Sequence, residues 1–341
     1  MSEFASSYDP GVQVSADDTL CLHRNENLLV GTDWAVDAAR AAIPQAAISS
    51  YPDATALPLR VALAEHYGVQ PENVFVGNGA DEVLADLLAA LRPRYNSFGV
   101  LDVHFKIYDL LAERMGFQVE DLAGHSFDSG HVTADGFNGL ALIDSPGAIA
   151  GSSVPVDEVL AFAKKEGSFL IWDNVYGEYA YHELPLPLPD NVVFVRSFSK
   201  FYGLAGLRVG YCIGEAGLIG RMLAQKDAFN VNSFGQVMAL AALKRHDQFA
   251  ALRDELVVQR TTLTRDLESL GFQVKPSDSV GVLATHPDHS AEWVQAELLK
   301  RRVAVRRFTD DKISNFIRVT AAAQSQMQHF LTVMKDVLGK A

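Results

Sequence analysis

Between residues 53 and 215, short apolar runs alternate with longer amphipathic stretches, and this alternation is the strongest constraint on the fold. The run at 74–76 is followed by a stretch whose leucines recur at i, i+3, i+4 and i+7, which is one face of a helix: Leu84, Leu87, Leu88 and Leu91. Four later runs are nearly continuous in apolar residues, as expected for strands that helices cover on both faces: 98–103, 139–144, 168–174 and 192–199. The pattern predicts an α/β fold whose large domain has a mainly parallel, doubly wound sheet.

The last third of the chain has a different pattern. A long charged amphipathic helix is expected at 249–270, ending near Gly271, and two or three short strands and two more helices follow it. This order is typical of a smaller α+β domain. The N-terminus shows no clear element. We therefore expect an N-terminal segment at 1–45 that packs near the active site, a large domain at 46–245 and a small C-terminal domain at 246–341.

The acidic composition bears on the partners of the protein. Its 341 residues include 29 Lys and Arg against 42 Asp and Glu, and a formal net charge of −13 repels phosphate backbones and anionic lipid. Cys21 and Cys212 stand alone, so neither a disulfide framework nor a zinc site is expected. The polar N-terminus is unlike a signal peptide, and no apolar run reaches the roughly 18 to 20 residues that span a bilayer. We expect a cytoplasmic protein with no nucleic-acid, membrane or metal partner.

Polar residues follow three of the expected strands. A Gly-Asn-Gly turn at 77–79 follows the first strand, Asp173 ends another, and Ser199 and Lys200 end a third. In open α/β sheets, ligands bind at the carboxyl ends of the strands. We therefore expect these residues to share one crevice and to form an active site.

The run SFSKFYGLAGLRVGY, at 197–211, carries the most information about chemistry. It places two hydroxyls, one lysine and one arginine in a glycine-rich strand–loop segment. With it, the chain resembles the histidinol-phosphate aminotransferase-like group of class I/II aminotransferases, which are fold-type I enzymes dependent on pyridoxal 5′-phosphate (PLP). The resemblance extends from Asn25-Glu26-Asn27 to Arg318 and implies that Lys200 holds the cofactor as a Schiff base and moves a proton during the reaction.

The resemblance also implies how the cofactor is held. Ser197, Ser199 and Arg208 match ligands of the cofactor phosphate, together with the turn and helix start that contain Gly79, Ala80 and Asp81. Three further residues match groups that contact the cofactor ring: Asp173 at the pyridine nitrogen, Tyr176 at the ring oxygen and Phe105 stacked on the ring face.

Substrate and subunit contacts are implied in the same way. Arg318 matches the arginine that binds the anionic end of the substrate, and Tyr108 and Asn27 lie in segments that match the substrate site. Tyr51, in Tyr51-Pro52-Asp53, matches a tyrosine that reaches the cofactor phosphate of the neighbouring subunit. The match implies a homodimer with shared active sites.

One segment departs from the family pattern. Where the family carries N-P-N-N-P-T-G, residues 145–151 have the sequence SPGAIAG, and the asparagine that would donate to the ring oxygen aligns with Ala148. Three explanations are open: a donor from elsewhere substitutes, the enzyme is a slow or divergent aminotransferase, or it runs a different PLP reaction.

We predict an aminotransferase that moves an amino group from an anionic donor, either an α-amino acid or histidinol phosphate, to a 2-oxo acid acceptor. A PLP-dependent decarboxylase or lyase of an amino acid, phosphorylated or not, is the alternative within enzymes. A non-catalytic PLP-binding protein is the alternative outside them. Two measurements separate these reactions when the donor is added without acceptor. Transamination changes the absorbance band of the cofactor, whereas decarboxylation releases carbon dioxide.

Overall fold

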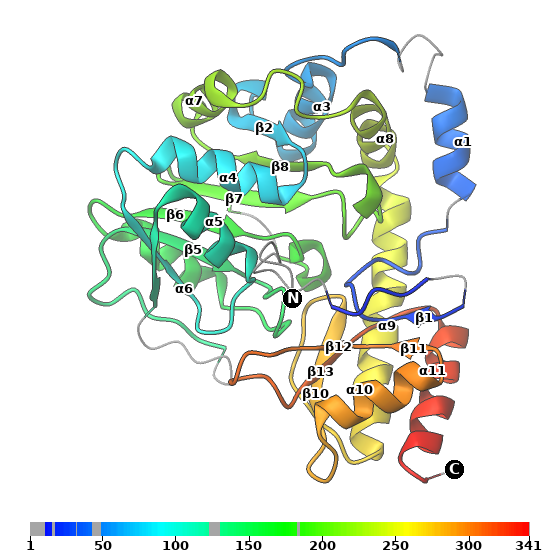
Figure 1. Ribbon diagram of the computed structural model, residues 1–341. Coiled ribbons are helices and arrows are strands. Elements are labelled where there is room, and N and C mark those ends of the chain that lie inside the picture. Colours follow the sequence, from blue (N-terminus) through cyan, green and yellow to red (C-terminus); the bar gives the residue numbers. More distant parts are fainter. Residues whose placement is uncertain are drawn as a thin grey trace.

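The computed structural model describes the chain in six ranges: 11–15, 18–31, 33–42, 49–122, 130–182 and 185–340. Figure 1 shows a larger upper part and a smaller lower part, joined by the long helix α9 (His246–Ser269). This helix agrees with the one expected at 249–270. The boundaries proposed between domains, at 45 and 245, stay predictions.

Seven strands form the sheet of the larger part within the described residues. Their order across the sheet is β2 (Val74–Gly77), β8 (Gly210–Ile213), β7 (Val192–Ser197), β6 (Phe169–Asp173), β5 (Leu140–Asp144), β3 (Ser97–Val100) and β4 (Gln118–Asp121). β8 runs antiparallel to both of its neighbours, and all other pairs are parallel. The predicted mainly parallel sheet is confirmed.

Helices cover both faces of this sheet (Figure 1). They are α3 (Leu57–Tyr67), α4 (Ala80–Leu91), α5 (Ile107–Met115), α6 (Val156–Ala161), α7 (Ala216–Gln225) and α8 (Ser233–Leu243). Alternate residues of β7 enter different apolar clusters: Val192 and Phe194 join one, and Val193 and Val195 join the other. Because successive side chains of a strand point to opposite faces, a strand buried on both faces has the continuous apolar run seen in the sequence.

The smaller part holds a four-stranded antiparallel sheet with the order β12 (Arg306–Arg307), β13 (Ile317–Thr320), β10 (Gly281–Thr285) and β9 (Gln273–Val274). Two helices follow in the sequence as expected, α10 (Ala291–Lys300) and α11 (Gln324–Val337). These helices, α9 and the sheet share one apolar core. The predicted smaller α+β unit is confirmed.

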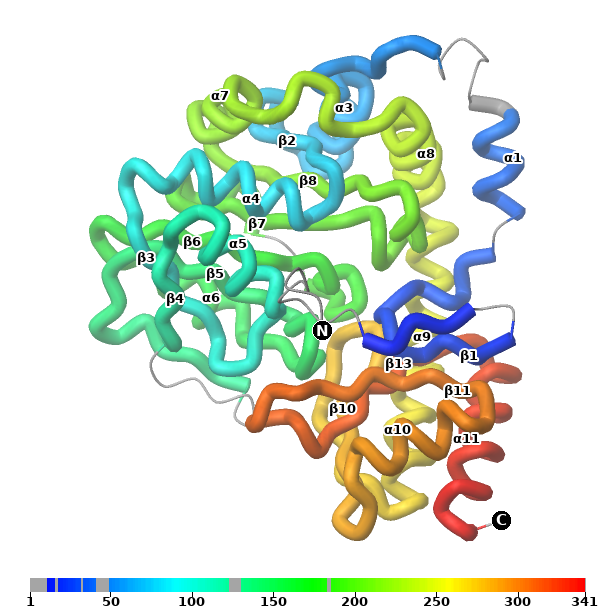
Figure 2. Tube along the Cα trace, in the orientation of Figure 1, coloured from blue at the N-terminus to red at the C-terminus, as the bar shows by residue number. Residues whose placement is uncertain are grey.

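The N-terminal segment is not without elements, and that expectation was wrong. β1 (Leu20–Cys21) pairs in parallel with β11 (Val303–Ala304), and α1 (Asp33–Ala42) packs on α8. A two-residue strand whose partner lies far away in the sequence leaves no local periodicity to detect. The tube in Figure 2 shows the β1 segment against the smaller part, where Leu22 is buried in its core. From there the chain passes the cavity described next.

Candidate active site

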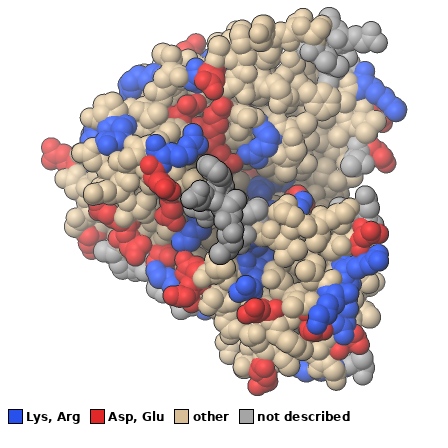
Figure 3. Space-filling view, in the orientation of Figure 1, with Lys and Arg blue, Asp and Glu red and all other residues tan. Residues whose placement is uncertain are grey.

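A cavity of about 630 Å³ lies at the carboxyl ends of the large sheet, where the smaller part closes over them. β6 ends at Asp173 and β7 ends at Ser197, and both residues line the cavity. Figure 3 shows a hollow between the two parts, with Lys and Arg side chains beside it. The lining combines two lysines, several arginines, buried carboxyls and aromatic rings, a mixture suited to an anionic ligand with a flat ring.

One end of the cavity is built from the start of α4. Gly79 precedes this helix with a φ of 84°, and a Cβ there would lie 2.5 Å from Nη2 of Arg208. A Cβ on Gly210 would collide with the backbone nitrogen of Ala80. The two glycines therefore let the guanidinium and β8 approach the helix start, whose backbone N–H groups and dipole favour anions. Arg208 is paired there with Asp81 at 2.7 Å.

Two serines at the end of β7 lie beside this anion site. Both are buried, at 3% exposure for Ser197 and 5% for Ser199, and both line the cavity. The hydroxyl oxygen of Ser197 accepts from the backbone N–H of Ser199 at 3.0 Å. The hydroxyl of Ser199 has no hydrogen-bond partner among the described residues. A buried hydroxyl left unpaired costs stability, so its position fits a ligand that bonds to it.

Asp173 is the buried carboxylate of the site. Its Oδ2 accepts from the hydroxyl of Tyr108 at 2.7 Å, and its Oδ1 accepts from the backbone N–H of Val175 at 3.1 Å. Burial raises the pKa of Asp173 to about 6, and these two donors oppose that rise. A carboxyl with this pKa is ready to ionise against a cationic ring nitrogen.

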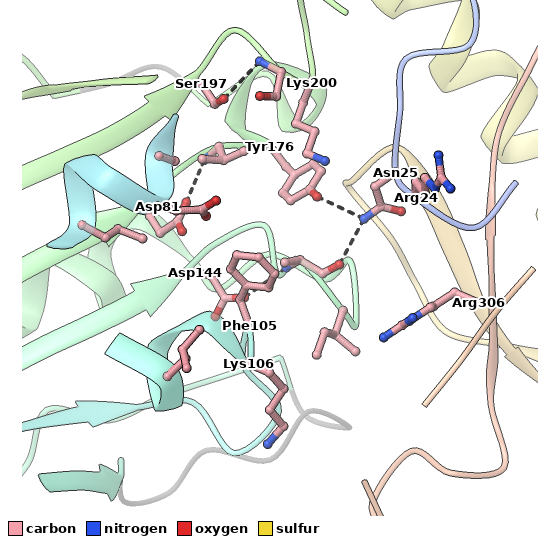
Figure 4. Close-up of a pocket in the computed structure, with 18 of the residues that line it drawn as sticks. Arg24, Asn25, Asp81, Phe105, Lys106, Asp144, Tyr176, Ser197, Lys200 and Arg306 are labelled. Atoms are coloured by element: carbon pink, nitrogen blue, oxygen red, sulfur yellow. Dashed lines mark hydrogen bonds between the residues drawn. The ribbon is translucent and has the colours of Figure 1, made fainter. Parts of the chain in front are cut away.

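Aromatic rings lie beside Lys200 in the cavity. Phe105, Tyr176 and Lys200 all line the cavity, and Nζ of Lys200 lies 5.8 Å from the centroid of the Tyr176 ring. Figure 4 shows the lysine amine and the tyrosine hydroxyl on the side of the cavity that Asn25 closes. The hydroxyl of Tyr176 accepts from the Asn25 amide at 3.1 Å.

The smaller part contributes a second group of cations. Arg306 on β12 stands directly opposite Arg318 on β13, and both line the cavity. Each guanidinium lies 5.5 Å from the centroid of the Phe308 ring. Arg318 also donates to the backbone oxygen of Ala148 at 2.8 Å and to that of His23 at 3.1 Å. Arg306 was missed in the sequence, because only the strand register reveals that it faces Arg318.

Four predicted site residues do not line the cavity. Gly79 is one of them, although Ala80 and Asp81, which directly follow it, do line the cavity. Asn27 is buried and donates to the backbone oxygen of Phe201 at 2.9 Å, whereas Asn25 of the same motif reaches the cavity. Tyr108 is fully buried and reaches Asp173 from the protein side. Tyr51 is 82% exposed and stacks on Phe229 with ring centroids 4.5 Å apart.

The residues present fit PLP. An anion site, a flat ring wall, a buried carboxyl and an amine surround one cavity, and these correspond to the phosphate, ring, ring nitrogen and aldehyde of that cofactor. The sequence pattern of the family Aminotransferase class I and II matches residues 17–333. The chain belongs to this family.

Similar proteins agree with the assignment. This aminotransferase is 33% identical over 340 residues to histidinol-phosphate aminotransferase 2 of Rhizobium meliloti, an alignment that covers 97% of this chain and 96% of that protein. The crystal structure of histidinol-phosphate aminotransferase from Sinorhizobium meliloti in complex with pyridoxal-5′-phosphate matches with a TM-score of 0.81 at 22% identity, covering 94% of this chain and 91% of that one. L-threonine-O-3-phosphate decarboxylase from Porphyromonas gingivalis matches with a TM-score of 0.83 at 20% identity, covering 94% and 100% of the two chains.

The predicted family, fold type, enzyme class and cofactor are therefore confirmed: the chain is a PLP-dependent aminotransferase. Among the described residues, every helix is too short or too polar to span a lipid bilayer. Within the same ranges, His, Cys, Asp and Glu side chains form no group of three or more placed to hold a metal ion.

Proposed function

We propose that this aminotransferase transfers the amino group of histidinol phosphate, an amine that carries a phosphomonoester, to a 2-oxo acid. The observation that carries the proposal is a second anion site in one cavity. Arg208 and the start of α4 form the first, and the paired Arg306 and Arg318 beside Phe308 form the second. Arginine suits a phosphate because its fork donates two parallel hydrogen bonds. The names of the curated relatives agree with this donor.

Each residue around the cofactor would have a separate role. When bound, PLP supplies an aldehyde that captures amines and a ring that accepts electrons from the substrate α-carbon. Lys200 would hold the aldehyde covalently and, once the donor displaces it, would carry the proton away from the α-carbon. Asp173 would keep the ring nitrogen protonated, Tyr176 would donate to the ring oxygen, and Phe105 would stack on the ring.

The phosphate of the cofactor would lie at the start of α4. There the backbone N–H groups of Ala80 and Asp81 follow Gly79, and the hydroxyls of Ser197 and Ser199 face the same end of the cavity. Arg208 would exchange its exposed partner Asp81 for the phosphate, which offers two charged oxygens.

We also propose a homodimer. Large apolar side chains are exposed on the N-terminal half of the larger part and on the nearby loop and helix that follow α7: Val36, Tyr51, Leu57, Val61, Phe229 and Phe234. α1 and α3 both pack on α8, and Tyr51 stacks on Phe229, so these side chains belong to one side of the molecule. An apolar surface of this kind marks a protein–protein contact.

The donor is tested with purified, PLP-loaded enzyme and no acceptor. Histidinol phosphate, histidinol, aromatic amino acids and a phosphorylated amino acid are added separately, and the cofactor absorbance and any released carbon dioxide are recorded. We expect histidinol phosphate to convert the cofactor, with kcat/KM about 100-fold above that of histidinol, since the pair differ by one phosphate bound by two arginines. Arg306→Gln should lose most of this difference, and Lys200→Ala should be inactive. If α-amino acids convert the cofactor and histidinol phosphate does not, the proposed donor is wrong. If carbon dioxide is released, the enzyme is a decarboxylase.

A further inference from the structure

Asn25 occupies an unusual position in the N-terminal segment. It is 2% exposed, it lines the cavity, and its φ of 53° lies in the left-handed region. Asparagine tolerates that region better than most residues because its short amide bonds to nearby groups. The backbone N–H of Asn25 donates to Oγ1 of Thr320 on β13 at 3.2 Å. The smaller part therefore fixes where this side chain points.

The amide of Asn25 makes two hydrogen bonds at the cavity wall. Its Nδ2 donates to the backbone oxygen of Ala148 at 3.1 Å and to the hydroxyl oxygen of Tyr176 at 3.1 Å, as the dashed lines in Figure 4 show. The carbonyl of Ala148 can only accept, so the atom that faces it is the nitrogen. On the other side, Oδ1 of Asn25 faces the hydroxyl of Thr320 at 3.5 Å. The orientation of the amide follows from these partners.

This orientation of the Asn25 amide determines whether the hydroxyl of Tyr176 donates or accepts in the bond between them. An amide N–H group donates and does not accept, so the oxygen of Tyr176 takes the accepting part in this bond. The hydroxyl proton of Tyr176 is then available for a bond in another direction. Tyr176 is 6% exposed and lines the cavity, so that direction includes the bound cofactor.

We propose that Asn25 is a positioning residue for the reaction: its amide holds Tyr176 with the hydroxyl proton directed into the cavity, toward the ring oxygen of PLP. The side chain at position 148 is a methyl group and cannot provide this amide, although its backbone oxygen anchors the amide that does. The inference rests on the role proposed for Tyr176 in cofactor binding, and it is independent of which donor the enzyme uses.

Three variants separate this role from a structural one. Asn25→Gly removes the amide without strain at positive φ, because glycine adopts that region freely. Asn25→Asp keeps the shape but replaces the donor with an acceptor, which would turn the hydroxyl of Tyr176 toward the carboxylate. Asn25→Gly combined with Ala148→Asn offers an amide from the opposite side of the same gap. Asn27→Ala is the matched control, because it removes a buried amide of the same segment whose bond goes to Phe201.

The readout is the pH titration of the visible absorbance band of the PLP-loaded protein without substrate. A donor to the ring oxygen favours its anionic form. In Asn25→Gly the hydroxyl of Tyr176 is no longer held toward that oxygen, so the apparent pKa of the band should rise by about one unit or more. We expect a larger rise in Asn25→Asp, a return toward the wild-type value in the double variant, and the wild-type value in Asn27→Ala. An unshifted band in Asn25→Gly, or an equal shift in Asn27→Ala, would overturn the inference. A histidinol phosphate assay that fails while these shifts appear would count against the proposed donor alone.

Discussion

Removing the hydroxyl of Tyr108 tests how Asp173 is tuned. That hydroxyl donates to Oδ2 of Asp173 over 2.7 Å, with Tyr108 fully buried and Asp173 only 6% exposed. A hydrogen bond to a charged group contributes about 1.5–3 kcal/mol, and 1.36 kcal/mol corresponds to one pKa unit, so Tyr108→Phe should raise the pKa of Asp173 by about 1–2 units. Burial already raises that pKa to about 6. The carboxyl of the variant should therefore titrate between roughly 7 and 8.

The pKa is measured by ¹³C NMR of aspartate carboxyls in the cofactor-free protein, with Asp173→Asn and Asp144→Asn used to assign the two buried groups. Tyr67→Phe is the matched control, because it removes a half-buried hydroxyl whose partner is the hydroxyl of Tyr211 at 2.7 Å. In the loaded enzyme, the half-reaction of Tyr108→Phe should slow about two- to tenfold at pH ~7, since less of Asp173 is ionised. An Asp173 pKa that stays unchanged or falls in Tyr108→Phe would refute the reasoning.

Two further predictions concern pH and assembly. Burial raises the pKa of Asp144 to about 7, so between about pH 4 and 7 the folded protein keeps a proton that the unfolded chain has lost, and its stability falls as pH rises. Cofactor-free Asp144→Asn lacks this loss. As pH rises from about 4 to 8, the unfolding free energy of the variant, measured by urea titration, should increase by about 3–4 kcal/mol relative to that of the wild type. The same pH dependence in both proteins would contradict the raised pKa of Asp144. If Tyr51 completes the partner's site, refolding an equal mixture of Lys200→Ala and Tyr51→Ala subunits should restore about a quarter of wild-type activity. Half of the dimers then contain one subunit of each kind, and each of these has one intact site out of two. A mixture no more active than either variant alone would place Tyr51 outside that site.

The large sheet could be predicted in part because burial on both faces leaves a continuous apolar run. The strands with such runs, for example β6 and β7, agree with the sequence analysis. β4 (Gln118–Asp121) was not predicted, because this edge strand is polar and largely exposed. β8 (Gly210–Ile213) was not predicted either, because it follows directly on the motif that carries Arg208. No local pattern states that β8 runs antiparallel between β2 and β7.

Site residues that directly follow a strand were predicted because the carboxyl ends of parallel strands meet at one edge. Asp173 and Lys200 are of this kind. Arg306 and Asn25 are not. The position of Arg306 depends on the register of β12 against β13, and that of Asn25 on a bond to Thr320, which is far away in the sequence. Tyr108 shows a different difficulty. It lies three residues after Phe105, but Phe105 lines the cavity and Tyr108 is buried against Asp173, and the sequence does not tell which side each aromatic ring takes.

The backbone of Ala148 has a role that the comparison of side chains at this position does not reveal. From the sequence, this position is a lost amide, with a substitute donor, a slow enzyme or another reaction as the three explanations. In the structure, the carbonyl of Ala148 accepts from Arg318 at 2.8 Å and from Asn25 at 3.1 Å. The polar network at the ring-oxygen end of the cavity is thus kept by residues far away in the sequence, which favours the first explanation. A substitution that removes a functional side chain can persist when the backbone at the same position holds its replacement.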